Sequence, residues 1–433
     1  MTSRRTFLRT SSAAVAGGVT VGWTGDVIAE SATLDSLPPS IRELRPLTDQ
    51  VVPISVEERR ARLEKARTLM HSSSIDAIVL TGGTSLDYFT GIKWGVSERL
   101  LALVLPARGT PFIVCPAFER DRAGEQIESG PLDSRSAVLT WEEHENPYDL
   151  VARGLRDAGL ATGRLGIEET VRFVFSDGIA KAAPALDTVS ATPVTAGCRA
   201  VKDEHELELM RFASQVTLKA YEAAWRALKE GMTQEGFRNL VAAAHRQLGF
   251  TGSASVQVGE YSALPHGSRT PQTIREGSIL LIDGGCSVEG YRSDISRTFV
   301  LGRPTDKMKR VFDIELTAQK AALAAARPGV PCEAVDAAAR KVIEDAGYGP
   351  GYRYFTHRVG HGLGMDVHEW PYLVRGNTLP LAPGMTFSDE PGIYLPGEFG
   401  IRLEDDIAIT ADGAEMFTPY STSLEDPFNT GGL

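Results

Sequence analysis

Two aspartates in one predicted hairpin, Asp283 and Asp294, are the residues whose type and spacing first indicate chemistry. They lie in the stretch Gly277–Thr298, where two apolar runs flank a turn. With the turn on Val288 and Glu289, the two carboxylates would lie directly opposite each other across an antiparallel pair. Like charges at that spacing destabilise a strand pair, so we expect a cation between them. Oxygen ligands suit Mn, Mg or Co, and the alternative is an exposed hairpin with two unrelated acids.

Further candidate ligands follow in the C-terminal half. His361 stands between two glycines, which allow the backbone to approach a bound group closely, and His368 comes seven residues later. Glu390 precedes a Pro-Gly turn, and Arg402 and Glu404 share one face of a predicted strand. A lone histidine is more often a packed or surface residue. The order Asp, Asp, His, Glu, Glu together indicates a metal site.

Composition limits the class of protein. The chain has 433 residues, 42% of them hydrophobic and 23% charged, which favours two globular domains. A formal net charge of −11 without a basic stripe argues against a nucleic-acid partner. After the leader, no run reaches the roughly 18 apolar residues of a membrane span, so no integral membrane domain is expected. Four cysteines without Cys-x-x-Cys spacing exclude a zinc ribbon and favour buried free thiols.

The first thirty residues resemble an export signal. Arg4 and Arg5 form a twin-arginine pattern, and the weakly apolar run Ser11–Trp23 follows it. We therefore predict a signal peptide at 1–30, export by the twin-arginine route and a periplasmic or extracellular location. An uncleaved N-terminal anchor and an accidental arginine pair are the alternatives.

The rest of the chain divides into a linker at 31–54, an α/β domain at 55–195 and a catalytic domain at 196–433. Ser55 is expected to cap the first helix of the α/β domain. Apolar runs predict strands at Ala77–Leu80, Leu100–Leu105, Pro111–Cys115, Ala137–Trp141 and Leu165–Ile167. The catalytic domain shows predicted helices at about 204–230, 233–249, 306–327 and 332–346. The order of helices, hairpin, helices and strands predicts two similar α+β halves with the chemistry between them.

These motifs carry a family resemblance. The segment from about Arg199 to Thr410 resembles the catalytic domain of the creatinase and methionine aminopeptidase superfamily. Its runs Ala-Leu-Pro-His, Val-Gly-His-Gly, Val-His-Glu-Trp-Pro and Asp-Glu-Pro-Gly are most similar to those of prolidase and aminopeptidase P. The resemblance implies an α+β fold, with a C-terminal pita-bread catalytic domain and an N-terminal creatinase-like α/β domain.

The resemblance also implies roles for individual residues. Two divalent metal ions, Mn foremost with Co or Zn possible, would be bound by Asp283, Asp294, His361, Glu390 and Glu404. Asp294 and Glu404 would bridge the ions. Glu390 would pass a proton to the leaving nitrogen, and His266 or His368 would stabilise the tetrahedral intermediate. The implied substrate-binding residues are His357, His368, Tyr372, Arg375 and Arg402.

The implied activity is hydrolysis of Xaa-Pro bonds in short proline-containing peptides, foremost as an Xaa-Pro dipeptidase. A dipeptidase needs a cation for the product carboxylate. Prolidases often place arginine where this chain has Tyr372, so Arg375 or Arg402 would take over. Aminopeptidase P, a creatinase-like metal-independent hydrolase and a non-catalytic peptide-binding protein are the alternatives, and methionine aminopeptidase fits poorly. The family also suggests a homodimer.

Overall fold

A computed structural model describes residues 36–132 and 136–431 of the chain. The predicted signal peptide at 1–30 lies outside the described residues. The predicted linker contributes a short helix, α1 (Pro39–Arg42), and a 3-10 turn, η2 (Thr48–Gln50). Within the described ranges, none of the helices has the length and apolar character needed to cross a membrane.

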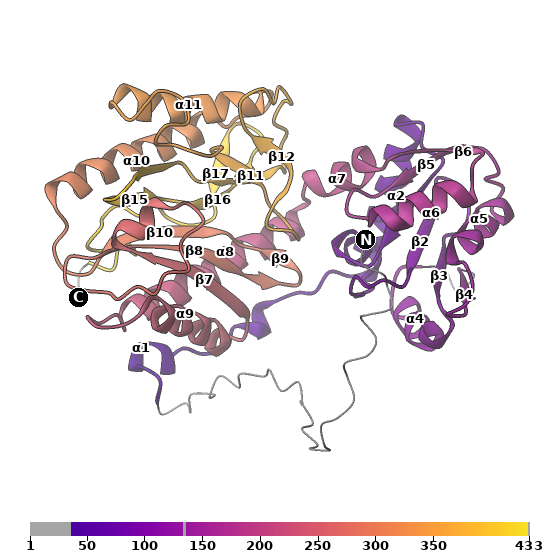
Figure 1. Ribbon diagram of the computed structural model, residues 1–433, viewed down its shortest axis with the longest axis horizontal. Coiled ribbons are helices and arrows are strands. Elements are labelled where there is room, and N and C mark those ends of the chain that lie inside the picture. Colours follow the sequence, from indigo (N-terminus) through magenta and orange to yellow (C-terminus); the bar gives the residue numbers. More distant parts are fainter. Residues whose placement is uncertain (1–35, 133–135, 432–433) are drawn as a thin grey trace, which may run out of the picture. The chain divides into compact units, whose positions relative to one another are not determined.

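The N-terminal part contains a six-stranded mixed sheet with the strand order β4-β3-β2-β1-β5-β6 (Figure 1). Each predicted apolar run forms a strand, and β6 is an additional polar, partly exposed strand. Strand β1 pairs antiparallel with β2 and parallel with β5, so the sheet mixes both ladders. The strands are β1 (Ala77–Thr81), β2 (Ala102–Pro106), β3 (Phe112–Pro116), β4 (Ala137–Trp141), β5 (Gly163–Ile167) and β6 (Leu186–Ser190).

Helices surround this sheet, and the first of them begins at a capping box. The Ser55 hydroxyl accepts from the backbone of Glu58, whose carboxylate accepts from the backbone of Ser55. Buried strand and helix residues form one apolar core in this part. The helices are α2 (Val56–Ser72), α3 (Thr84–Thr90), η3 (Ala117–Glu119), α4 (Arg120–Glu128), α5 (Pro147–Asp157), α6 (Phe173–Ala182) and α7 (Thr192–Ala200).

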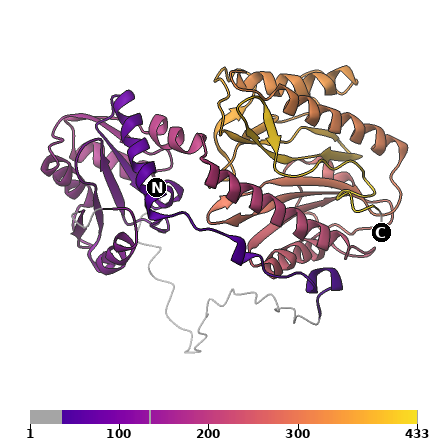
Figure 2. The same ribbon diagram turned by 180° about the vertical axis from the view of Figure 1, so that it is seen from behind.

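The first half of the catalytic part packs two helices on an antiparallel sheet. Helix α8 (Glu204–Trp225) contacts β8, and α9 (Gln234–Leu248) contacts β7 (Figure 2). A capping box at Asp203 begins α8, as the sequence predicts, although the helix ends five residues before the predicted Glu230. The strands are β7 (Thr251–Val258), β8 (Ile279–Val288), β9 (Tyr291–Arg292) and β10 (Ile295–Val300), with the 3-10 turn η4 (Gly259–Ala263).

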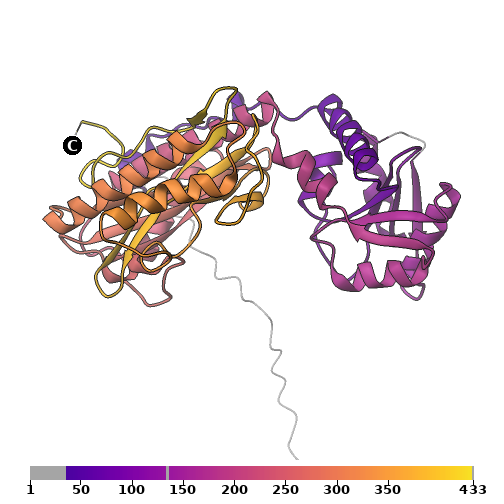
Figure 3. The ribbon, with the colours of Figure 1, turned by 90° about the horizontal axis from the view of Figure 1, so that it is seen from above.

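The second half repeats this plan with another helix pair. Helices α10 (Asp306–Ala325) and α11 (Cys332–Asp345) pack side by side, and α11 contacts β12 (Figure 3). A five-stranded sheet of order β12-β11-β13-β16-β17 and the hairpin β14-β15 complete this half. The strands are β11 (Gly360–Gly362), β12 (Glu369–Leu373), β13 (Thr386–Asp389), β14 (Gly392–Leu395), β15 (Phe399–Arg402), β16 (Asp405–Ile409) and β17 (Ala414–Met416).

Strand β10 joins the two halves through its contacts with β15 and β16. An isolated bridge between Ser296 and Glu404 lies at this junction. The α+β class is therefore confirmed, and the predicted acidic residues lie where the two halves meet. All four cysteines are buried and free, as expected.

Candidate metal centre and active site

The aspartate hairpin forms, but its predicted register is wrong. Strand β8 pairs with β10 so that Asp283 lies opposite Ser296. The turn is on Glu289 and Gly290, with φ of 50° and 89°, one residue later than predicted. Both turn positions require positive φ, which a valine at the first position would resist.

Both aspartates nevertheless stay on one face of the sheet. The ladder puts Asp283 opposite Ser296, and Asp294 lies two residues before Ser296, directly before β10 begins. Side chains alternate with a period of two, so Asp294 and Ser296 point the same way. The Ser296 hydroxyl contacts both Asp283, at 3.1 Å, and Glu404, at 2.6 Å. The backbone amide of Asp294 donates to the carboxylate of Asp406.

The other three predicted ligands come from the second half. His361 is the centre of β11, Glu390 follows β13, and Glu404 stands between β15 and β16. The glycines on both sides of His361 permit close strand contacts. A Cβ atom at Gly360 would lie 2.0 Å from the carbonyl oxygen of Ser388, and one at Gly362 would lie 2.5 Å from that of Glu369. No larger residue fits beside this histidine.

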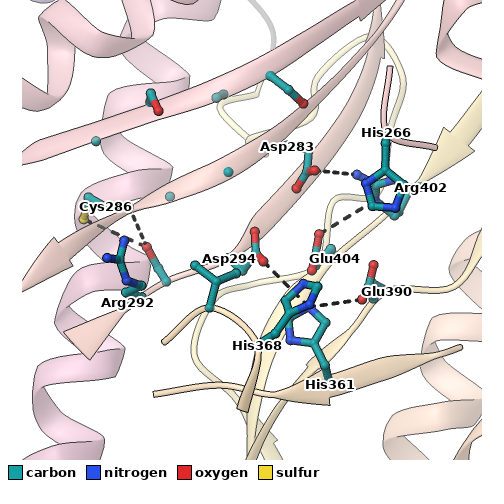
Figure 4. A pocket seen from close by; sticks show the side chains of 18 of the residues that line it. His266, Asp283, Cys286, Arg292, Asp294, His361, His368, Glu390, Arg402 and Glu404 are labelled. Carbon is teal, nitrogen blue, oxygen red and sulfur yellow. Dashed lines mark hydrogen bonds and ion pairs between the residues drawn. The ribbon is translucent and has the colours of Figure 1, made fainter. Parts of the chain in front are cut away.

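The five predicted ligands converge on one space (Figure 4). Three groups of their side-chain atoms each lie within 4.8 Å of one another, and His368 joins one of these groups. Asp294, His361 and Glu404 each belong to two groups. The groups are Asp294, His361 and His368; His361, Glu390 and Glu404; and Asp283, Asp294 and Glu404.

The orientation of His361 fits a metal ligand. Its Nδ1 lies 3.1 Å from the carbonyl oxygen of Gly362, so Nδ1 carries the proton and donates to that oxygen. The Nε2 lone pair then faces Glu390 at 3.3 Å and Asp294 at 3.8 Å. Burial, with the nearby His368 as the next cause, lowers the pKa of His361 to about 3, which keeps the imidazole neutral.

The four carboxylates of the site carry more negative charge than the nearby positive side chains can balance. Burial, followed by the charge of Asp283, raises the pKa of Asp294 well above its ordinary value. Burial and then Asp294 do the same to the pKa of Glu404, and burial raises the pKa of Glu390 to about 7. Divalent cations would remove this cost, and four carboxylates with one imidazole suit hard or borderline ions. The residues present therefore fit the metal ions implied by the sequence.

Arg402 is a buried cation that contacts the carboxylates of two of these ligands. Its guanidinium lies 2.7 Å from the carboxylate of Asp283 and 3.8 Å from that of Glu404. It also donates to the hydroxyls of Ser296 and Tyr394, each at 2.9 Å. Through these contacts Arg402 orients the metal ligands, as residues that hydrogen-bond to metal ligands commonly do.

His357 belongs to the same network. Its Nδ1 donates to the carbonyl oxygen of Arg358 at 2.8 Å, so its Nε2 accepts from the Tyr394 hydroxyl, also at 2.8 Å. Burial, with the charge of Arg402 as the next cause, lowers the pKa of His357 to about 3. A neutral His357 thus fixes Tyr394 beside Arg402.

The site opens into a cavity of about 670 Å³. All five predicted ligands line it, and so do the predicted substrate residues His266, His357, His368 and Arg402. Tyr372 does not line this cavity and instead borders a smaller one of about 310 Å³, which shares His368 with it. Arg375 borders neither, because β12 ends at Leu373 and the next turn leaves this side chain exposed near the ring of Tyr352.

Sequence reasoning missed four residues of this site. Ser296 could have been found, because it lies two residues after Asp294, the spacing that brings side chains to one face of an extended chain. Asp406 lies two positions after the predicted ligand Glu404, and its carboxylate accepts a hydrogen bond from the backbone amide of Asp294. Tyr394 and Arg358 carried no pattern of their own, since their positions depend on how the second half packs.

Known proteins resemble the chain over most of its length. The family model described as "Metallopeptidase family M24" matches residues 208–411, and "Creatinase/Prolidase N-terminal domain" matches 62–201. The "Probable dipeptidase PepE" of Mycobacterium tuberculosis is 38% identical over 83% of this chain and 93% of its own length. The chain belongs to metallopeptidase family M24.

Two further proteins are similar to this chain in sequence or structure. The "Xaa-Pro dipeptidase" of Lactobacillus delbrueckii subsp. lactis is 33% identical over 84% of this chain and 98% of that protein. The crystal structure of dipeptidase PepE from Mycobacterium ulcerans superposes with a TM-score of 0.80 at 34% identity, covering 86% of this chain and 99% of that one. Family membership makes this chain a peptidase that uses divalent metal ions, and it confirms the superfamily predicted from the motifs.

Proposed function

We propose that this protein hydrolyses Xaa-Pro bonds in short peptides, foremost as an Xaa-Pro dipeptidase with two divalent metal ions. The observation that carries the proposal is the convergence of all five predicted ligands on one cavity of about 670 Å³. The relatives named as dipeptidase and Xaa-Pro dipeptidase support the substrate class.

Asp294, His361 and Glu404 each belong to two of the three ligand groups. Asp294 and Glu404 are the proposed bridging ligands among them, because a carboxylate has two oxygens that could bind two ions, whereas His361 has one free lone pair, on Nε2. Asp283 would complete one metal position, and His361 with Glu390 would complete the other. When bound, the ions lower the pKa of water and polarise the scissile carbonyl. The oxygen-rich donor set is the basis for proposing Mn, with Co or Zn as the alternatives.

Side chains around the ligands would handle protons and charge. The Glu390 carboxylate faces the cavity and can carry a proton from the attacking water to the leaving imino nitrogen. His266 and His368 line the same cavity and can donate hydrogen bonds to the developing oxyanion. A tertiary Xaa-Pro amide restricts the preceding residue, so its hydrolysis calls for a dedicated cavity.

Substrate length separates the two leading candidates. We would strip the purified protein of metal, resupply Mn²⁺ and measure hydrolysis of Ala-Pro, Ala-Pro-Ala and Ala-Ala. Metal-dependent cleavage of Ala-Pro in preference to the others is expected. Cleavage of the tripeptide alone would identify an aminopeptidase P, and no cleavage with metal bound would overturn the proposal. Glu390→Gln, prepared in parallel, controls for a contaminating peptidase.

Export by the twin-arginine route is also proposed, on the pattern at Arg4 and Arg5 alone. Because this route carries folded proteins, the metal site could be filled before export. We expect a double Arg4→Lys and Arg5→Lys variant to stay in the cytoplasm while the native chain is exported, as measured by cell fractionation and immunoblotting. Equal export of both chains would contradict the proposed route.

A homodimer is proposed from the resemblance only. Sedimentation equilibrium of the purified protein should give twice the mass of the chain, and a monomer at all concentrations would contradict the proposal.

A further inference from the structure

The catalytic cavity contains an arginine that no role has yet been given. Arg358 lies two residues before β11, and its half-buried side chain lines the cavity together with His266, His357 and His368. Its guanidinium carbon lies 4.1 Å from the centre of the Tyr372 ring. Stacking on an aromatic face holds the planar guanidinium in place without using its hydrogen-bond donors.

The positive charge of Arg358 acts on the carboxylate of Glu390 without forming an ion pair with it. Within residues 36–132 and 136–431, no hydrogen bond or ion pair occupies its guanidinium, which stacks on the ring of Tyr372. The other arginines of the cavity are engaged. Arg402 is paired with Asp283, and the exposed Arg292 donates to the carbonyl oxygen of Met365. Figure 4 shows Arg292 beside Cys286, whereas Arg402 lies by Asp283.

The field of Arg358 reaches the residues expected to contact substrate. Burial lowers the pKa of His368, and the positive charge of Arg358 is the next cause. This part of the cavity therefore favours an anion. A free guanidinium fork matches a carboxylate better than any neutral group.

We propose that Arg358, oriented by Tyr372, binds a carboxylate of the substrate. Two carboxylates could reach it: the C-terminal carboxylate of the prolyl residue, or the side-chain carboxylate of an acidic residue before proline. The inference rests on the proposed Xaa-Pro activity. Arg358 would thus be a residue that determines specificity, and it takes over the task that the sequence assigned to Arg375 or Arg402.

Two pairs of substrates test the proposal on the metal-loaded enzyme. Ala-Pro is compared with Ala-Pro amide, which lacks the terminal charge, and Glu-Pro is compared with Gln-Pro, which lacks the side-chain charge. Arg358→Met removes the charge and retains a stem of similar length that can still pack on Tyr372. We expect one acid-to-neutral ratio of kcat/KM to fall by on the order of ten- to a hundredfold, through KM rather than kcat.

The pair that responds identifies the carboxylate, and Arg358→Lys should restore part of the lost ratio. Arg292→Met is the matched control, because it removes a cavity arginine on the Cys286 side, and its ratios should equal those of the native enzyme. Unchanged ratios in Arg358→Met, or an equal loss in Arg292→Met, would overturn the assignment of Arg358. Failure of the native enzyme to cleave any of the four substrates would instead contradict the proposed function.

Discussion

At the scale of residues, the candidate metal centre brings four carboxylates and one neutral imidazole around a single space. Aspartate, histidine and glutamate carry their chemistry in their type, so their order identifies a metal site before any fold is known. Arg358 and Arg375 show the limit, because one lies shortly before the His361 motif and the other shortly after the His368 motif, and only Arg358 lines the cavity. Where β12 ends and where the ring of Tyr372 lies decide which arginine lines the cavity. No sequence pattern predicts either of these features.

Removal of one ligand should separate activity from stability. In Asp294→Asn we expect hydrolysis to fall by more than about a hundredfold, because even outer-shell changes at metal sites cost about 10–100-fold. The metal-free variant should unfold at the same or a higher temperature than the metal-free native chain, since one buried like charge is gone. Calorimetry of both metal-free proteins measures this.

The exposed Asp345, paired with Lys341 on helix α11, provides the control. Asp345→Asn should keep full activity. If the metal-free Asp294→Asn protein were clearly less stable than the metal-free native protein, repulsion among the carboxylates would not be what lowers the stability of the metal-free state.

At the scale of elements, apolar runs predicted the strands of the N-terminal sheet because burial dictates their composition. The half-exposed strand β6 and the three-residue strand β11 were not predicted, because neither contains an apolar run. The register of the aspartate hairpin was also predicted wrongly. The backbone conformation decides which two residues form the turn, and the observed turn lies one residue later than the predicted one. Gly290, with φ of 89°, fixes that turn after Glu289.

A substitution at this turn should therefore be costly. Gly290→Ala forces a Cβ onto positive φ and within 2.8 Å of the methyl carbon of Met365, so we expect a loss of about 1–3 kcal/mol in the free energy of unfolding. Gly413→Ala is the control, because Gly413 does not have a positive φ and a Cβ atom added there would lie 4.0 Å from its nearest neighbour, the hydroxyl oxygen of Thr410. Urea denaturation of both variants gives the comparison. Equal stabilities would mean that the turn does not determine the hairpin.

At the scale of the whole molecule, the metal centre lies between two halves that each contribute ligands, so its charge should influence global stability. Burial raises the pKa of Glu390 to about 7 in the metal-free protein, and those of Asp294 and Glu404 rise in the same direction. A carboxyl whose pKa is higher in the folded chain contributes stability below its unfolded pKa. That contribution is lost as the pH rises through the folded pKa.

The metal-free protein should accordingly be less stable at about pH 8 than at about pH 5.5, and added Mn²⁺ should raise the melting temperature more at the higher pH. Differential scanning calorimetry with and without metal at both values measures the difference. A larger gain at the lower pH would show that the carboxylates are not the groups that limit the metal-free state.

The number of metal ions that activity requires tests the central claim most directly. The stripped protein would be titrated with Mn²⁺ while hydrolysis of Ala-Pro is followed and bound metal is measured by elemental mass spectrometry. The five-ligand centre predicts that the stripped protein is inactive and that activity reaches its plateau with two bound ions per chain. Full activity in the stripped protein, or bound metal without hydrolysis, would contradict a dinuclear Xaa-Pro peptidase.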